Sequence, residues 1–163
     1  MNSYDTLIIG TGCAALKCAD ELCHMGRKSL AILTDDERAG TSRNAGSDKQ
    51  TYYKLTLSGF DGDSVGEMAR TLFSGGCVDG THALCEAALS APCFLRLCEL
   101  GVPFPTNRYG EYIGYKTDHD PRRRATSAGP LTSKMMAEAL DKSVRAAGVP
   151  ILNHRLVVSI ATQ

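Results

Sequence analysis

The most constraining feature of this chain is the segment Y-D-T-L-I-I-G-T-G-C-A-A at residues 4–15. Leu7, Ile8 and Ile9 form an apolar run with the length of a short buried strand. Gly10 and Gly12 follow it, where the chain must turn sharply before the next element. Glycine has no side chain, so it permits the turn and lets a ligand approach the backbone closely. The segment therefore predicts a strand that runs into a ligand-binding turn.

A helix and a second strand follow this turn. Residues 13–25 place apolar side chains on one face and charged ones on the other, which predicts a helix that ends at Gly26. Residues 29–34 (S-L-A-I-L-T) form a second apolar run of strand length. The order of elements predicts a βαβ unit over residues 5–34, with a right-handed crossover and two parallel strands buried on both faces.

The pattern Gly10-x-Gly12-x-x-Ala15 lies between the predicted strand and helix, the context in which such a motif indicates a dinucleotide site. The helix that starts near Cys13 presents unpaired N–H groups and a partial positive charge, which suit a pyrophosphate. A tight turn without any ligand is the alternative. The motif predicts an acidic residue at the end of the second strand, but Thr34 stands there. Asp35 and Asp36 could replace that acid or could form an ordinary turn.

The segment 35–60 is polar and too long for a simple connector, and long loops in compact domains tend to be functional. Its part G-T-S-R-N-A-G-S-D-K-Q at residues 40–50 has small side chains and hydrogen-bonding groups that could wrap a long cofactor. A flexible surface loop is the alternative. Beyond it we expect helices at 62–73, capped by Asp63 or Ser64, and at 80–100, interrupted or kinked at Pro92. An irregular stretch with a small hairpin at 109–115, a helix at 131–147 and a strand at 150–160 complete the chain.

Composition and charge exclude several classes of protein. The 163 residues suffice for one domain, and 43% apolar with 22% charged residues indicates a globular chain. Eighteen basic and eighteen acidic residues cancel, so no net field favours nucleic acid or anionic lipid. No apolar stretch could span a bilayer and the start is unlike a signal peptide, so we expect a cytoplasmic location. The run Arg122–Arg124 is interpreted as a solvated loop or as a phosphate or carboxylate contact.

The cysteines and histidines do not predict a metal site. Seven cysteines without a C-x-x-C pair favour reduced thiols that pack as small apolar groups, as in the pairs Cys18/Cys23 and Cys93/Cys98. Cys13 lies at the start of the first helix, which could lower its thiol pKa. Three adjacent side chains at residues 118–120 (D-H-D) cannot all face one ion, so a polar turn is the better interpretation.

Three segments together resemble the FAD-binding domain of the succinate dehydrogenase, fumarate reductase and aspartate oxidase flavoproteins. They are D-T-L-I-I-G-T-G-C-A-A-L-K-C-A, then A-I-L-T-D-D-E-R-A-G-T-S-R-N-A-G-S, then D-P-R-R-R-A-T-S-A-G-P-L-T-S-K-M-M-A-E-A-L. The resemblance implies a Rossmann-like α/β fold with a parallel sheet, a flavin loop at 35–60, a helical insertion at 61–130, and a helix and third strand at 131–161. The small hydroxyl residue Thr34 is similar to the residue that the succinate dehydrogenase branch carries there.

The resemblance also implies where FAD binds. Its pyrophosphate is expected at Gly10, Thr11, Gly12, Cys13, Ala14 and Ala15, its adenosine ribose near Thr34 and Asp35, and its flavin end along Thr41, Ser42, Asn44, Ala45, Gly46 and Ser47. That branch links its flavin to a histidine of this loop. This chain has no histidine between His24 and His82, so noncovalent FAD is expected. The paired glycines of the family appear as Gly46-Ser47, and S-A-G-P-L-T replaces the later Asp-x-Thr-Gly pattern.

The family's substrate-binding domain, with its working arginine and histidine, has no counterpart here, so we expect no catalytic residue in this chain. A three-stranded sheet with the first strand at its edge would leave that strand unpaired on one side, so the fold is expected to be incomplete at the C-terminus. The leading hypothesis is the FAD-binding segment of an oxidoreductase that transfers hydride to or from a C–C bond. An NAD(P)-binding module and a non-catalytic fragment are the alternatives.

Overall fold

The computed structural model of the chain describes residues 3–48, 50–59 and 62–162. The chain divides into two compact units, which we call the first unit (residues 1–47 and 133–163) and the second unit (residues 48–132). The predicted flavin loop at 35–60 therefore contributes residues to both units.

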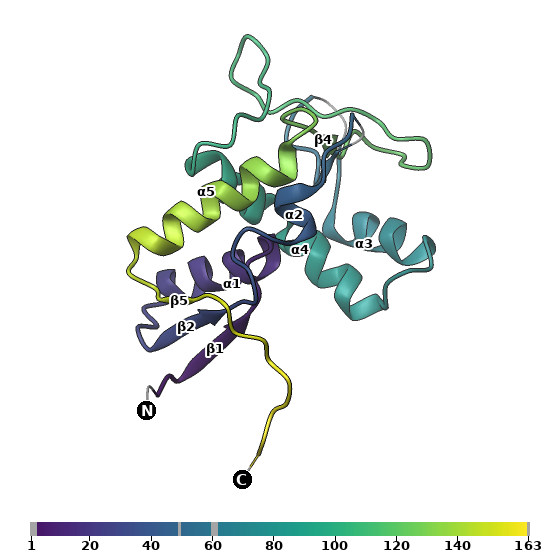
Figure 1. Cartoon of the computed structure of the whole chain (residues 1–163). Helices are drawn as coiled ribbons and strands as arrows, with labels where there is room; N and C mark the ends of the chain where they lie inside the picture. The colour runs from purple at the N-terminus through teal and green to yellow at the C-terminus, as the bar shows by residue number, and fades with distance from the viewer. Residues whose placement is uncertain (1–2, 49, 60–61, 163) are drawn as a thin grey trace. The chain divides into compact units, whose positions relative to one another are not determined.

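The first unit contains a three-stranded parallel sheet with the order β1-β2-β5 (Figure 1). Its elements are β1 (Thr6–Ile9), α1 (Cys13–His24), β2 (Leu30–Leu33), α2 (Thr41–Asn44), α5 (Thr132–Ala146) and β5 (Ile151–Leu152). Ile8 of β1 stands opposite Ile32 of β2, which in turn stands opposite Ile151 of β5. The predicted strand, glycine turn, helix and parallel strand are confirmed.

The core of the first unit lies where α1 and α5 meet the sheet residues. Leu16 and Ala19 of α1, Ile32 of β2 and Leu140 of α5 are at most 1% exposed. Asp20 of α1 is also buried, and its Oδ1 accepts a 2.7 Å hydrogen bond from the Ser143 hydroxyl of α5. This bond satisfies a carboxylate that would otherwise be costly to bury.

The strand β1 is not buried on both faces as predicted. Ile8 is buried, but Leu7 and Ile9 on the opposite face are 54% and 58% exposed. In the sheet that the described residues form, β1 lies at an edge, as expected. Successive side chains of a strand point to opposite faces, so a strand that is covered on a single face exposes the side chains of its other face to water.

The strand predicted at 150–160 is much shorter in the structure, where only Ile151 and Leu152 pair with β2. The chain then leaves the sheet, and its Arg155 amide donates to the Thr34 carbonyl at 2.9 Å. Leu156, Val158 and Ile160 are all more than 70% exposed. The β-branched composition predicted a strand, but a strand requires a neighbour to pair with over its whole length.

The second unit pairs two short antiparallel strands and packs two helices against each other. They are β3 (Tyr52–Tyr53) with β4 (Ala125–Thr126), and α3 (Val65–Ser74) with α4 (Gly80–Glu99). Ser64 caps α3 by accepting from the Glu67 amide, and Asp79 caps α4 in the same way. Both predicted helices are confirmed to within a few residues. However, α4 continues through Pro92 instead of being interrupted there.

Aromatic rings and one buried arginine form the interior of the second unit. Phe94 lies 4.6 Å from Phe104 and 5.0 Å from Tyr112, measured between ring centroids. Arg124 is fully buried, and its Nη2 and Nε donate to both carboxylate oxygens of Asp63 at 2.7 and 2.9 Å. Its Nη1 also donates to Asp120 Oδ1 at 3.1 Å. Such a fork suits a planar guanidinium facing a carboxylate.

This arrangement bears on two expectations. The run Arg122–Arg124 makes the carboxylate contacts of the second interpretation and is not a fully solvated loop, because Arg124 is buried against Asp63 and Asp120 and Arg122 pairs with Glu67 at 2.8 Å. The small hairpin expected at 109–115 is also displaced. A bridge joins Thr106 to Tyr112, and a second joins Tyr115 to Ala125.

One of the cysteine interpretations changes as well. Cys18 is exposed, so it does not act as a packing residue of α1. Cys23, Cys93 and Cys98 are half-buried, in keeping with a packing role. All seven cysteines are free thiols.

Candidate cofactor-binding site

The glycine turn between β1 and α1 has the geometry that the motif predicts. Gly10 has a φ of 98°, a conformation that side chains of L-residues rarely adopt, and its amide donates to the Leu33 carbonyl at 2.7 Å. Gly12 has an ordinary φ of −75°, but a Cβ placed there would lie 3.4 Å from Ser42 Oγ. Gly10 is therefore needed for its conformation, and Gly12 keeps the space beside Ser42 open.

The N-terminus of α1 is the positive end of this site. The Cys13 amide donates to the Ser42 hydroxyl at 3.1 Å, so a residue of α2 caps the helix. The first amide that bonds to a carbonyl of the helical turn is that of Leu16, which donates to Gly12 O at 3.0 Å. The amides of Ala14 and Ala15 come before this point and add to the partial positive charge that attracts a phosphate.

Thr34 occupies the end of β2, where the motif predicts an acid. Its hydroxyl lies 3.3 Å from the Thr11 hydroxyl, and both side chains are buried. Thr34 Oγ1 also donates to the Asp36 carbonyl at 3.3 Å. The hydroxyl of Thr34 therefore joins the glycine turn to the segment that follows β2.

The two aspartates after Thr34 have different roles. Asp36 Oδ1 accepts a 2.8 Å hydrogen bond from the Arg38 amide, so this carboxylate closes a turn. Asp35 is exposed, and its carboxylate forms no hydrogen bond or ion pair with the described part of the chain. Of the two, Asp35 is the carboxylate that remains available to a ligand.

The short helix α2 contains three of the residues that the sequence assigned to the flavin end, namely Thr41, Ser42 and Asn44. Ser42 contacts the glycine turn directly, as described above. Asn44 instead turns back on its own loop, where Nδ2 donates to the carbonyls of Arg38 and Gly40 at 2.9 and 3.0 Å. Thr41 is exposed. Ala45 ends α2 in an extended conformation, with a ψ of 146°, and Gly46 and Ser47 follow it.

The environment of Cys13 opposes the expected activation of its thiol. Burial raises the pKa of Cys13, although the hydrogen bond with Ser42 and the charge of Arg43 partly offset this effect. Its Sγ donates to the Ser133 carbonyl at 3.5 Å. The expectation that the helix N-terminus lowers this pKa was wrong, because desolvation of the thiolate outweighs the helix field. Cys13 is a packed thiol in this site.

Sequence reasoning missed a group of charged residues beside the site. Arg43 of α2 lies 3.5 Å from Asp141 of α5, and Arg145 of α5 contacts both Asp141 and Glu37. The i, i+4 spacing of Asp141 and Arg145 was visible in the sequence. Nothing in the sequence indicated that these two residues reach the segment after β2.

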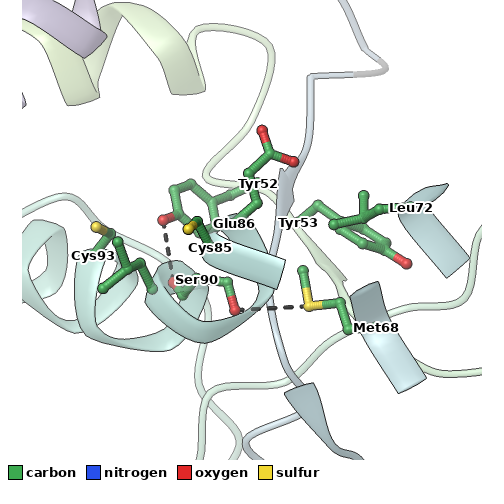
Figure 2. A pocket seen from close by; sticks show the side chains of 9 residues that line it. Tyr52, Tyr53, Met68, Leu72, Cys85, Glu86, Ser90 and Cys93 are labelled. Carbon is green, nitrogen blue, oxygen red and sulfur yellow. Dashed lines mark hydrogen bonds between the residues drawn. The ribbon is translucent and has the colours of Figure 1, made fainter. Parts of the chain in front are cut away.

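The second unit has a separate pocket of about 470 Å³ (Figure 2). In it the Tyr52 hydroxyl donates to the Ser90 carbonyl at 3.2 Å, and burial raises the pKa of Tyr52, so its phenol stays protonated. Among the described residues that line the pocket, Glu86 is the only carboxylate. It is lined by Tyr52, Tyr53, Met68, Leu72, Cys85, Glu86, Leu89, Ser90 and Cys93.

Among the described residues no three His, Cys, Asp or Glu side chains are grouped to hold a metal ion. Over the same ranges, none of the helices is long and apolar enough to cross a membrane. Residues 118–119 form a turn, and the Asp120 carboxylate that follows accepts a hydrogen bond from Arg124.

The glycine turn, the α1 N-terminus and the parallel βαβ unit define a dinucleotide-binding α/β fold. A sequence model of the family described as FAD binding domain matches residues 5–163, so the chain belongs to this family and binds FAD. The site accommodates such a group, because Gly12 leaves the space beside Ser42 free and the amides of Ala14 and Ala15 precede the helix's own hydrogen bonds. A comparison with curated proteins gives no match.

Solved flavoproteins share this fold at low sequence identity. The FrdA protein of Escherichia coli quinol fumarate reductase matches with a TM-score of 0.70 and 16% identity over 92% of this chain and 25% of its own. Sdh1 of Mycobacterium smegmatis gives 0.71 and 17% over 93% and 27%. Adenylylsulfate reductase of Archaeoglobus fulgidus gives 0.65 and 21% over 93% and 24%. The chain thus spans about a quarter of the length of these proteins.

Proposed function

We propose that this chain is the FAD-binding segment of a flavin-dependent oxidoreductase that transfers hydride to or from a C–C bond, as fumarate reductases and succinate dehydrogenases do. The observation that carries the proposal is the glycine turn at the start of α1 with Ser42 of the following loop bonded to it at 3.1 Å. Bound FAD would supply the redox chemistry, while the residues of this chain bind and orient it.

Each part of the site has a proposed role. The turn from Gly10 to Ala15 holds the diphosphate by amides and by the charge of the α1 N-terminus. Thr34 shapes the floor near the adenosine ribose, and Asp35 accepts hydrogen bonds from the ribose hydroxyls. The segment from Thr41 to Ser47 faces the flavin end, with Asn44 holding the shape of the loop. The FAD is held noncovalently, since the loop contains no histidine.

The substrate site and the electron partner lie outside these residues in this proposal. The substrate in this proposal is a dicarboxylate, an enoate or another compound that offers a C–C bond for hydride removal.

Titration of the purified chain with FAD, followed by quenching of flavin fluorescence, tests the proposal. Saturable binding of one FAD, release of free flavin on acid precipitation, and no displacement by excess NAD would support it. Displacement of FAD by NAD would favour an NAD(P)-binding module instead. Absence of any dinucleotide binding by a folded chain would favour the non-catalytic alternative and contradict the proposal.

A further inference from the structure

Four charged side chains of alternating sign connect α5 to the segment after β2. Arg145 Nη2 lies 2.8 Å from Glu37 Oε2, and Arg145 Nε lies 3.0 Å from Asp141 Oδ2. Asp141 Oδ1 in turn lies 3.5 Å from Arg43 Nη2. We call this series Glu37–Arg145–Asp141–Arg43 the charge ladder. All four residues belong to the first unit.

The two ends of the charge ladder differ in burial. The side chains of Asp141 and Arg43 are only 18% and 15% exposed, whereas those of Arg145 and Glu37 are 47% and 29% exposed. Arg43 Nε and Asp141 Oδ1 are both buried and form no hydrogen bond with the described residues, so the two side chains interact as an ion pair. Asp141 is thus the anion that neutralises Arg43. Removing one member of a buried pair leaves its partner charged and desolvated, which costs far more than losing a surface pair.

The charge ladder attaches to both sides of the loop that follows β2. Glu37 precedes that loop's turn, and its amide also donates to Asn153 Oδ1 at 3.0 Å. Arg43 lies in α2, next to Ser42, whose hydroxyl accepts the Cys13 amide of the glycine turn. A shift of Arg43 would therefore move the group that caps α1.

We propose that Asp141 is a positioning residue of the FAD site, which holds residues 37–43 against α5 so that Ser42 stays on the N-terminus of α1. It acts through Arg43 and Arg145 and does not itself contact FAD. The part of this inference that concerns FAD affinity rests on the proposed function. The part that concerns the order of the loop does not.

Simple electrostatics predicts the opposite effect of mutation. Asp141→Asn removes a negative charge near the site of the anionic diphosphate. The weaker electrostatic repulsion would by itself tighten FAD binding. Positioning predicts weaker binding, because the freed Arg43 withdraws Ser42 from the turn. Even a small displacement of the residues that contact a ligand loses much of the affinity of a binding site. The sign of the change in affinity therefore separates the two explanations.

The first test compares Asp141→Asn with Glu138→Gln in the full chain. Glu138 lies on the same helix and is 54% exposed in a 3.9 Å pair with Lys134, so its substitution removes the same charge without touching the charge ladder. We expect Asp141→Asn to raise the Kd for FAD about tenfold and Glu138→Gln to leave it within about twofold. An unchanged or lower Kd in Asp141→Asn would overturn the inference.

The second test needs no cofactor. Hydrogen exchange of the amides at 38–44 is measured in the chain without FAD, with the thermal midpoint as a measure of the whole fold. We expect at least fivefold faster exchange there in Asp141→Asn, with amides of β2 unchanged. Equal exchange in both proteins would overturn the inference even if FAD does not bind at all, a result that would contradict the proposed function separately.

A third variant guards against a folding defect. Arg145→Gln breaks the more exposed end of the charge ladder and leaves the less exposed pair of Asp141 and Arg43 in place, so it should fold normally. It is expected to give a smaller change of the same sign in both measurements. Combined with Asp141→Asn, it should add little, because both changes disrupt one connected unit. Full additivity would contradict a ladder that acts as a whole.

Discussion

The hydroxyl groups of Thr11 and Thr34 lie 3.3 Å apart, one from the glycine turn and the other from the end of β2. Their side chains are 4% and 7% exposed, so water does not easily replace this bond. It joins the two loops between which a dinucleotide would lie. The bond therefore contributes to the shape of the site before any ligand binds.

Thr34→Val should lower the free energy of unfolding by about 1–2 kcal/mol, because it leaves the buried Thr11 hydroxyl without its partner. Thr11→Val should have a similar effect. The double variant should be less destabilised than the sum of the two, since it removes both polar groups together. Urea unfolding of all four proteins measures this cycle. Additive effects would show that the two hydroxyls are not coupled.

Gly12→Ala and Gly10→Ala should affect different properties. Gly12 has a φ of −75° and its new methyl would lie 3.4 Å from Ser42 Oγ, so stability should change by less than about 0.5 kcal/mol. FAD affinity should fall at least tenfold, because the methyl occupies the approach to the turn. Gly10→Ala, at a φ of 98°, should cost about 1–2 kcal/mol of stability. Calorimetry and FAD titration together distinguish them.

Gly114→Ala should destabilise the second unit strongly. A Cβ there would lie 2.1 Å from the Arg123 carbonyl oxygen and 3.1 Å from that of Ala125, and backbone atoms of a paired strand cannot move away cheaply. We expect a loss above about 2 kcal/mol. Gly110→Ala is the control, because its Cβ would meet nothing within 4 Å and the cost comes only from its φ of 81°. Similar melting temperatures for the two variants would contradict this.

Arg124→Met should cost about 3–5 kcal/mol, because it leaves the buried carboxylates of Asp63 and Asp120 without their cation. Arg122→Met should cost less than about 1 kcal/mol, since Arg122 and Glu67 are 31% and 28% exposed. Chemical denaturation of both variants measures the difference. A loss below 1 kcal/mol in Arg124→Met would mean that the ion network is no more than a surface arrangement.

The same network should make the chain sensitive to acid. Burial would raise the pKa of Asp63, but hydrogen bonds from Arg124 and from two amides outweigh it and lower this pKa to about 2. Because the folded pKa lies below the ordinary value of 3.8, the stabilisation is complete above pH 4 and is lost as the pH falls toward 2. The loss should be on the order of 2 kcal/mol. Unfolding measured from pH 5 to 2 should show this fall, and Asp63→Asn should flatten it.

Much of the fold could be predicted because the signals are local. The apolar periodicity of α1, α3, α4 and α5 and the capping residues Ser64 and Asp79 lie within or next to the helices that they specify. The strand length at 150–160 was overestimated, because pairing with β2 ends after Leu152. The length of a strand depends on how far it pairs with a neighbouring strand, and that neighbour is distant in the sequence.

The sequence by itself determined the βαβ unit, the glycine turn and the membership of a flavin-binding family, since these depend on residue types at fixed short spacings. Only the tertiary structure decided what the polar groups do. It brings the hydroxyls of Thr34 and Thr11 within hydrogen-bonding distance and pairs the buried Arg124 with Asp63. It also raises the pKa of Cys13 by burial and pairs Asp141 with Arg43. The paired residues are separated by between about 20 and 100 positions in the sequence. The pKa of Cys13 depends on burial of its thiol. The energies of these interactions come from geometry and desolvation that exist only after the chain has folded.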